Sequence, residues 1–232
     1  MYNKISIIIP ALNEEKFIEK TLKSTASAHT MEVIVVDGGS CDQTVAMARS
    51  MGADVIISPP SRSAQMNKGA LKAKGDILLF LHADTLLPEN FDVHIINSLK
   101  LPGIAAGAFK LHIESENSLL IHFIEGLANI RSRFLGLPYG DQAIFVPAGI
   151  FHSTGGFPAT PIMEDFEFIR KSGKKGKIVI LPLSVSTSPR RWEKLGVIKT
   201  TFINQLVVAA YFLGIPPDVT ARWYRRGFRK SQ

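Results

Sequence analysis

The chain has 232 residues, of which 46% are hydrophobic and 20% charged, and these values are typical of a globular protein with a substantial core. It has no low-complexity segment and no internal repeat, which excludes fibrous and solenoid architectures. Its single cysteine, Cys41, excludes a disulfide within the chain. Together with a start that lacks the regions of a signal peptide, this predicts a cytoplasmic protein.

The formal net charge is +7, and basic residues are concentrated after residue 170 and again at the C-terminus. Such a surface favours anionic partners, namely diphosphates, nucleic acid or acidic lipid headgroups. A solvated face that only aids solubility explains the C-terminal cluster equally well.

The first hundred residues alternate short apolar runs with helical patterns. Helices are predicted over 14–28, with Asn13 as N-cap, over 42–51, capped by Asp42, and over 63–74. Continuous apolar runs between helices indicate a parallel sheet covered on both faces. We therefore predict an α/β fold with a doubly wound sheet, whose strands span 5–9, 33–36, 55–57 and 77–81.

The second half is more mixed. Strands are expected over 107–113, 143–146, 178–181 and 184–187, and helices over 118–135, 164–171 and 196–214, followed by a last basic helix after Pro216-Pro217. The absence of a clear linker favours one domain over 1–195, with a helical extension and basic tail over 196–232.

Polar residues follow three of the predicted strands. Asn13 and Glu14 come after the first, Asp37 after the second and Asp84 after the fourth. Ligands in open α/β sheets bind beyond the carboxyl ends of the strands. These side chains are therefore expected to meet in one crevice.

Asp84 is a candidate ligand for a divalent ion that bridges two phosphates, because Mg²⁺ and Mn²⁺ prefer hard oxygen ligands. His82 points to the same side of an extended backbone, as a second metal ligand or a phosphate donor. The alternative for Asp84 is a cap for a helix that begins near Pro88.

Glu164 and Asp165 form an acidic pair at a predicted helix start. Acids at this position gain from the helix dipole, and taken alone the pair is best explained as a cap. The functional alternative is a general base that takes the proton of an attacking hydroxyl group.

Arg190, Arg191 and Trp192 offer two guanidinium groups and an aromatic plane. Arginines stabilise a departing diphosphate through charge-assisted hydrogen bonds. A basic surface pair beside a core tryptophan is the competing explanation, and the loop residue Arg62 has the same ambiguity.

In order along the chain, these segments resemble the family 2 glycosyltransferases, which have the GT-A (Rossmann-like) nucleotide-binding fold. The resemblance covers about residues 4–195. It rests on residues 8–15, on VVDGGSCDQT (35–44), on Asn67-Lys68-Gly69, on KGD (74–76), on His82-Ala83-Asp84, on Glu164-Asp165 and on Arg190-Arg191-Trp192. Residues 139–142 and the Arg-Arg-Trp segment look like a small bacterial subgroup labelled as arsenosugar-biosynthesis or carotenoid-acid glycosyltransferases.

The resemblance implies a role for each matching position. Asp165 would be the catalytic base, with Glu164 beside it, while Arg191 and Trp192 would serve the leaving group and the acceptor. Asp84 and His82 would hold Mn²⁺ or Mg²⁺, and Asp141 and Gln142 would contact the acceptor. The implied donor site, in which Asp37 contacts the nucleoside, comprises Pro10, Ala11, Asn13, Glu14, Asp37, Gly39, Arg62, Asn67, His82, Asp84 and Arg190.

Three positions depart from the family pattern. The second nucleoside acid is Gly38, the first Asp of the DxD motif is His82, and the glutamine of the QxxRW motif is replaced by Ser188. The last departure argues against a processive polymer synthase. The resemblance therefore implies a non-processive, inverting, metal-assisted transferase, which takes a UDP-sugar by preference and an acceptor hydroxyl or carboxyl group.

The long helix over 196–214 is expected to pack on the domain or to lie in a membrane interface on the inner face of the cell membrane, where a lipid-like acceptor would be reached. A helix that forms an oligomer is the alternative. Two other functions were weighed: a sugar-phosphate nucleotidyltransferase, whose glycine-rich signature is missing after the first strand, and a non-catalytic carbohydrate- or lipid-binding module. No nucleic-acid-binding motif is present, so a nucleic-acid partner is not expected.

Overall fold

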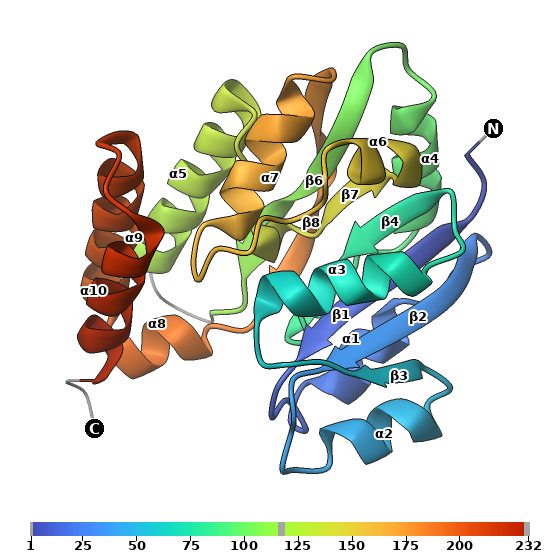
Figure 1. The fold of residues 1–232 in the computed structure, drawn as a ribbon, viewed down its shortest axis with the longest axis horizontal. Helices are drawn as coiled ribbons and strands as arrows, with labels where there is room; N and C mark the ends of the chain where they lie inside the picture. Colours follow the sequence, from blue (N-terminus) through green and yellow to red (C-terminus); the bar gives the residue numbers. More distant parts are fainter. Residues whose placement is uncertain (1, 116–118, 230–232) are drawn as a thin grey trace.

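The computed structural model describes residues 2–115 and 119–229, apart from the side chains of residues 31, 191, 194, 195 and 225–229. Its centre is an eight-stranded sheet in the order β3-β2-β1-β4-β7-β6-β8-β5 (Figure 1). Helices cover both faces, and three C-terminal helices extend from one end of the sheet. The predicted α/β class is confirmed.

The first four strands are mutually parallel, as predicted. They are β1 (Ile5–Ala11), β2 (Thr30–Asp37), β3 (Asp54–Ile57) and β4 (Ile77–Phe80). β1 runs past its predicted end because its pairing with β2 continues to Ala11, whereas its pairing with β4 stops at Ile8. Pro10, which has no N–H to donate, therefore lies where β1 pairs with β2 alone.

The other half of the sheet is mixed. β7 (Ile144–Pro147) lies antiparallel between β4 and β6 (Ile104–Ile113), and β6 pairs in parallel with β8 (Lys177–Thr187). β5 (Thr85–Leu86) then pairs antiparallel with β8, at the end of the sheet order. Residues 178–187 were predicted as two strands and form one, which absorbs Pro182 at an irregularity in the register with β6.

Two cores lie on opposite faces of the sheet, since successive residues of β1 point to opposite sides. Ile5, Ile7 and Ile9 pack with one set of helices and Ile8 with the other. The first set comprises α1 (Ile18–Ser24), α2 (Thr44–Ser50) and α4 (Phe91–Leu99), and the second comprises α3 (Arg62–Lys72), α6 (Ala148–Ser153) and α7 (Glu164–Gly173).

The helix predicted over 14–28 begins later, at Ile18, and Asn13 does not cap it. Asn13 adopts a left-handed backbone conformation with φ of 56°. Its side-chain oxygen accepts a hydrogen bond from the N–H of Cys41 at 2.9 Å, and its own N–H donates to Ser40. Asn13 therefore fastens the loop after β1 to the loop after β2. Asp42 was also predicted as a cap, but α2 begins at Thr44 with Gln43 in the cap position, and the Asp42 carboxylate accepts from the N–H of Thr44 from one residue further back.

The C-terminal part packs around α5 (Leu119–Leu135). α8 (Arg190–Leu195), α9 (Val197–Phe212) and α10 (Pro217–Arg229) follow β8, and α9 contacts α5, α8 and α10 (Figure 1). A third small core joins Trp192 to Leu111, Ile113 and Ile121. Among the residues that the structure describes, none of the helices combines the length and the apolar character needed to cross a bilayer.

Candidate active site

A cavity of about 450 Å³ opens at the carboxyl ends of β1 and β4, where the sequence placed the crevice. Its walls come from segments far apart in the chain: the ends of β1, β4 and β8, the start of α3, the turn η1 (Gly140–Gln142), the start of α7, and α8, α9 and α10. The sheet curls so that β8 and β5 return to the end of β4. The N–H of Ser188 donates to the carbonyl of Asp84 at 3.1 Å.

Arg190 joins two carboxylates on one side of this cavity. Its guanidinium group donates to both oxygens of Glu14, at 2.6 and 2.5 Å, and forms an ion pair with Oδ2 of Asp84 at 3.0 Å. It also lies over the ring of Phe17. Arg190 is thus half-buried and paired, and the alternative of a basic surface pair is wrong for this residue.

The charges of this group act on the pKa values of Glu14 and Arg190. Burial raises the pKa of Glu14 above its ordinary value, the hydrogen bond from Arg190 lowers it in part, and the charge of Asp84 raises it again. Burial lowers the pKa of Arg190, but its hydrogen bond to Glu14 and the charge of Asp84 outweigh this and raise the pKa. This end of the cavity therefore holds two carboxylates around one guanidinium group.

The second acidic group lies at the start of α7. Met163 occupies the cap position with φ of 65°, a conformation that costs energy for a residue with a side chain. Asp165 accepts hydrogen bonds from the N–H of Gly140 at 2.6 Å and of Phe166 at 2.7 Å. The acidic pair therefore lies in the first turn, and the cap position belongs to Met163.

Glu164 is nearly buried in the cavity wall, with 6% of its surface exposed. Burial raises its pKa, the adjacent Asp165 raises it further, and Arg62, with Nη1 3.6 Å from Oε1, lowers it in part. A carboxylate with a raised pKa is a stronger proton acceptor than an ordinary one. The arrangement can take a proton from a bound hydroxyl group.

Eleven of the residues singled out from the sequence line the cavity. They are Pro10, Ala11, Glu14, Arg62, His82, Asp84, Asp141, Glu164, Asp165, Arg190 and Trp192. Asp84 is not a helix cap, because α4 begins at Phe91 after the cap residue Asn90. Trp192 is both a core residue and part of the wall. The side chain of Arg191 lies outside what the structure describes.

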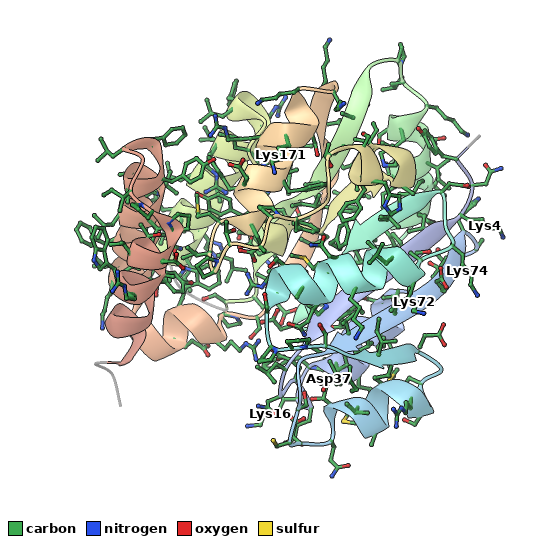
Figure 2. The ribbon with its side chains drawn as sticks, viewed as in Figure 1. Lys4, Lys16, Asp37, Lys72, Lys74 and Lys171 are labelled. Carbon is green, nitrogen blue, oxygen red and sulfur yellow. The ribbon has the colours of Figure 1, made fainter. Side chains whose placement is uncertain are left out.

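The other predicted site residues whose side chains are described do not line the cavity. Asp37, buried at the end of β2 (Figure 2), accepts from the N–H groups of Gly39 and Ser40 and from the Ser40 hydroxyl. Asn67 exchanges two hydrogen bonds with the backbone of Phe157. Gln142 donates to the carbonyl of Phe109, and Asn13 joins two loops. These hydrogen bonds hold the loops around the cavity in place.

The sequence missed several parts of the wall. Gln65 holds the loops after β1 and β2 together by donating to the carbonyls of Ala11 and Val36, at 2.9 and 2.7 Å. Tyr139 lies under the guanidinium group of Arg131, whose Cζ atom is 3.4 Å from the centre of the tyrosine ring. The wall also includes Ile162, Met163, Asn204, Val207, Val208 and Tyr224. Tyr139, Met163, Asn204, Val207 and Val208 lie in stretches that the sequence marked, but nothing in the sequence assigned them to the cavity.

A divalent metal ion fits this site if a ligand supplies part of its coordination. Among the described residues, no three or more His, Cys, Asp or Glu side chains gather to hold a metal. Asp84 nevertheless offers a hard oxygen ligand in a region of concentrated negative charge, where Arg190 now supplies the positive charge. Mg²⁺-type sites commonly use one or two carboxylates together with phosphate oxygens.

Comparison with known proteins agrees with this geometry. Residues 6–151 match the model of the family described as "Glycosyl transferase family 2". The probable glycosyltransferase YdaM of Bacillus subtilis is 31% identical over 140 residues, which are 52% of this chain and 33% of YdaM. The 4,4'-diaponeurosporenoate glycosyltransferase of Staphylococcus haemolyticus is 40% identical over 92 residues, 36% of this chain and 24% of that protein. The matches span about a third or less of these relatives.

Solved structures with the same fold include two transferase complexes. Glucosyl-3-phosphoglycerate synthase from Mycobacterium tuberculosis, with Mn²⁺ and UDP-glucose, has a TM-score of 0.66 at 20% identity, covering 92% of this chain and 80% of that one. The mannosyltransferase PcManGT from Pyrobaculum calidifontis, with GDP-mannose and Mn²⁺, has a TM-score of 0.64 at 18% identity. This match covers 80% of this chain and 57% of PcManGT. At these identities the likeness establishes the fold, which is GT-A.

Proposed function

The chain belongs to glycosyl transferase family 2, and from this premise we propose that it transfers a sugar from a nucleotide-diphosphate sugar, preferentially a UDP-sugar, to a hydroxyl or carboxyl group of an acceptor. One observation carries the proposal. A single cavity joins an acidic end, where Asp84 and Glu14 surround Arg190, to a second carboxylate pair, the buried Glu164 and its neighbour Asp165. Sugar transfer needs one group that binds the diphosphate of the donor and a second, nearby group that removes a proton from the acceptor.

The donor diphosphate is assigned to the end of the cavity that holds Asp84. Asp84 would hold Mn²⁺ or Mg²⁺, which neutralises charge on the leaving diphosphate. Arg190 is held in place by Glu14, and its fixed guanidinium group offers charge-assisted hydrogen bonds to phosphate oxygens. Arg62 borders the same cavity with half of its side chain exposed. The mycobacterial synthase, crystallised with UDP-glucose and Mn²⁺, supports this assignment.

The acceptor is assigned to the end formed by α7. Asp165 is the proposed base, since it matches the family motif and its orientation is fixed by the N–H of Gly140. It would take the proton of the attacking group, while Glu164 sets the charge beside it. Direct attack opposite the leaving diphosphate inverts the anomeric carbon. Ser188, where processive synthases have glutamine, favours transfer of a single sugar.

The acceptor is proposed to have an apolar part. A second cavity of about 210 Å³ shares Ile162 and Met163 with the first. Its remaining wall is mainly apolar or aromatic and includes Pro158, Tyr211 and Ile215. An acceptor that reaches from Asp165 into this space would bury apolar atoms there.

Calorimetry with UDP, with and without Mn²⁺, tests the donor site. Binding to the wild-type chain should require Mn²⁺. The isosteric variant Asp84→Asn should lose at least about tenfold in affinity, or about 1.4 kcal/mol. Asp54→Asn, an exposed acid at the start of β3, is the matched control and should bind normally. Equal binding by Asp84→Asn, or no response to UDP, GDP or their sugars, would refute the proposed donor site.

A further inference from the structure

Two neighbouring helices each present a stripe of apolar side chains to solvent. On α5 the exposed apolar side chains include Leu120, Phe123, Leu127, Ile130 and Phe134, and on α9 they include Ile198, Phe202 and Leu206. Within each helix they recur every three or four residues, so they lie on one side. Exposure reaches 63% for Phe123, 77% for Phe134 and 67% for Phe202. We call this set the apolar face.

The opposite sides of both helices are occupied. On α5, Asn129 exchanges hydrogen bonds with the backbone of Leu111, and Glu125 accepts from the N–H of Ile113. On α9, Val207 and Ala210 are buried. Since α5 and α9 also contact each other at one end of the molecule (Figure 1), their outward stripes lie on neighbouring helices. Exposed apolar patches of this kind mark sites of contact with a partner or a membrane.

The positive charge of the chain is concentrated in its C-terminal part, which favours an anionic partner for the apolar face. Residues 190–232 contain nine Lys or Arg and two Asp or Glu, whereas residues 1–189 contain 18 of each, so the whole net charge of +7 belongs to the C-terminal part. On α5 and α9 the exposed charged residues are both basic, Arg133 and Lys199. On α10, next to α9, Arg222 and Trp223 are exposed.

We propose that the apolar face docks on the surface of a bilayer containing anionic lipid. The phenylalanine and leucine side chains would enter the boundary between headgroups and acyl chains, and Arg133, Lys199 and Arg222 would contact lipid phosphates. A second copy of the chain fits less well, because it would bring two C-terminal parts of charge +7 together. The docking surface does not depend on the proposed reaction.

Docking would also place the active-site cavity near the membrane. α9 carries the apolar face on one side and contributes Asn204, Val207 and Val208 to the cavity wall on the other. A helix with its side chains is about 10 Å across. The cavity would therefore lie about one helix diameter from the lipid surface.

Vesicle flotation of the full chain tests the proposal. The wild type should float with vesicles of phosphatidylcholine and phosphatidylglycerol, and binding should weaken with salt and when phosphatidylglycerol is omitted. Phe123→Ser with Phe202→Ser should reduce the partition coefficient by about tenfold per phenylalanine. Lys199→Gln with Arg222→Gln should reduce it by about fivefold per charge, with anionic vesicles only.

The control substitutions lie on α3 and just after it. Leu71 is 77% exposed, as is Phe134, and Leu71→Ser should leave flotation unchanged. Lys72 and Lys74 lie at the edge of the molecule opposite α9 and α10 (Figure 2), and Lys72→Gln with Lys74→Gln should also have no effect. Circular dichroism establishes that each variant is folded.

Two results would overturn the proposal. One is a folded wild-type chain that does not float with anionic vesicles. The other is a lipid-free dimer in analytical ultracentrifugation that dissociates on Phe123→Ser with Phe202→Ser, since a second copy would then cover the face. Calorimetry with UDP and Mn²⁺ in lipid-free buffer tests the donor site separately, so failure of docking is distinguishable from failure of the proposed reaction.

Discussion

Asp165 and Glu164 are adjacent in sequence but differ in surroundings. Asp165 is held by the N–H groups of Gly140 and Phe166, whereas Glu164 is nearly buried beside Arg62. The motif position and the fixed orientation favour Asp165 as the base, and the raised pKa makes Glu164 its competitor. Substituting each in turn separates the two roles.

Asp165→Asn is expected to lower kcat by about 10² to 10⁴-fold, since it removes a proton acceptor and keeps the shape of the side chain. The affinity for UDP in the presence of Mn²⁺ should stay unchanged, because Asp84 and Arg190 are intact. Initial rates of nucleotide release and calorimetry measure the two quantities, with Asp54→Asn as control. Wild-type turnover by Asp165→Asn would transfer the role of base to Glu164.

Glu164→Gln is expected to raise the melting temperature at neutral and alkaline pH. Burial and then Asp165 raise the pKa of Glu164 in the folded chain, so folding favours its protonated form. The stability from this preference is complete below the ordinary pKa of 4.5 and is lost as pH rises through the raised pKa. Glutamine stays neutral throughout. The melting temperatures of the variant and the wild type should therefore agree at acidic pH, and the variant should melt at the higher temperature as the pH rises.

Thermal melts of the two proteins across this pH range measure the difference. Glu89→Gln, an exposed acid before α4, should show no such dependence. A Glu164→Gln variant that is less stable than the wild type at alkaline pH would mean that the carboxylate form stabilises the fold, contrary to the raised pKa.

Close packing between elements fixes the mixed half of the sheet. β6 lies against β7 and β8 at Gly107, where an added Cβ atom would stand 2.3 Å from the ring of Phe145 and 2.7 Å from Val179. Phe145 and Phe109 are in edge-to-face contact in the same core. Within the mixed half, β6 therefore meets its two neighbouring strands at a position that only glycine fits without movement.

Gly107→Ala should destabilise the chain by about 1–3 kcal/mol through overpacking. Gly126→Ala is the matched control, because it lies within α5 with nothing inside 4 Å of the added atom, and it should be neutral or stabilising by about 1 kcal/mol. Urea unfolding of the two variants measures both values. Equal stability of Gly107→Ala and the wild type would show that the strands move apart easily.

At the scale of the whole molecule, the cavity depends on the C-terminal helices as much as on the sheet. Trp192, Val207 and Tyr224, from α8, α9 and α10, line the space that also holds Asp84 and Asp165. The predicted division into 1–195 and 196–232 stays a prediction, but the second segment forms part of the wall.

UDP with Mn²⁺ is therefore expected to slow hydrogen exchange in α8, α9 and the start of α7, by about tenfold or more at saturating ligand. Residues 44–57, in α2 and β3, contribute nothing to the cavity wall among the described residues and serve as the internal control. Exchange measured by mass spectrometry gives the protection of each segment. Protection confined to residues before 190 would mean that the C-terminal helices do not respond to the donor.

The sequence by itself determined the parallel half of the sheet and the acidic residues at its edge. Apolar runs such as Ile5–Ile9 are buried on both faces, and such strands carry their own signal in continuous hydrophobicity. The motif residues Asp84, Asp165 and Arg190 were also recognisable, through the resemblance to the family motifs, although each had a purely structural alternative when taken alone. The N-cap role of Asn13 was wrong, since a tertiary hydrogen bond to Cys41 outweighed its local preference.

Only the tertiary structure decided which of these residues meet, and in what state. Arg190 and Glu14 are 176 residues apart in sequence and form two hydrogen bonds, because the curled sheet returns β8 to the end of β4. The raised pKa of Glu164 and the apolar face shared by α5 and α9 likewise arise from burial and exposure. Both depend on contacts between distant segments, which no local pattern of residues contains.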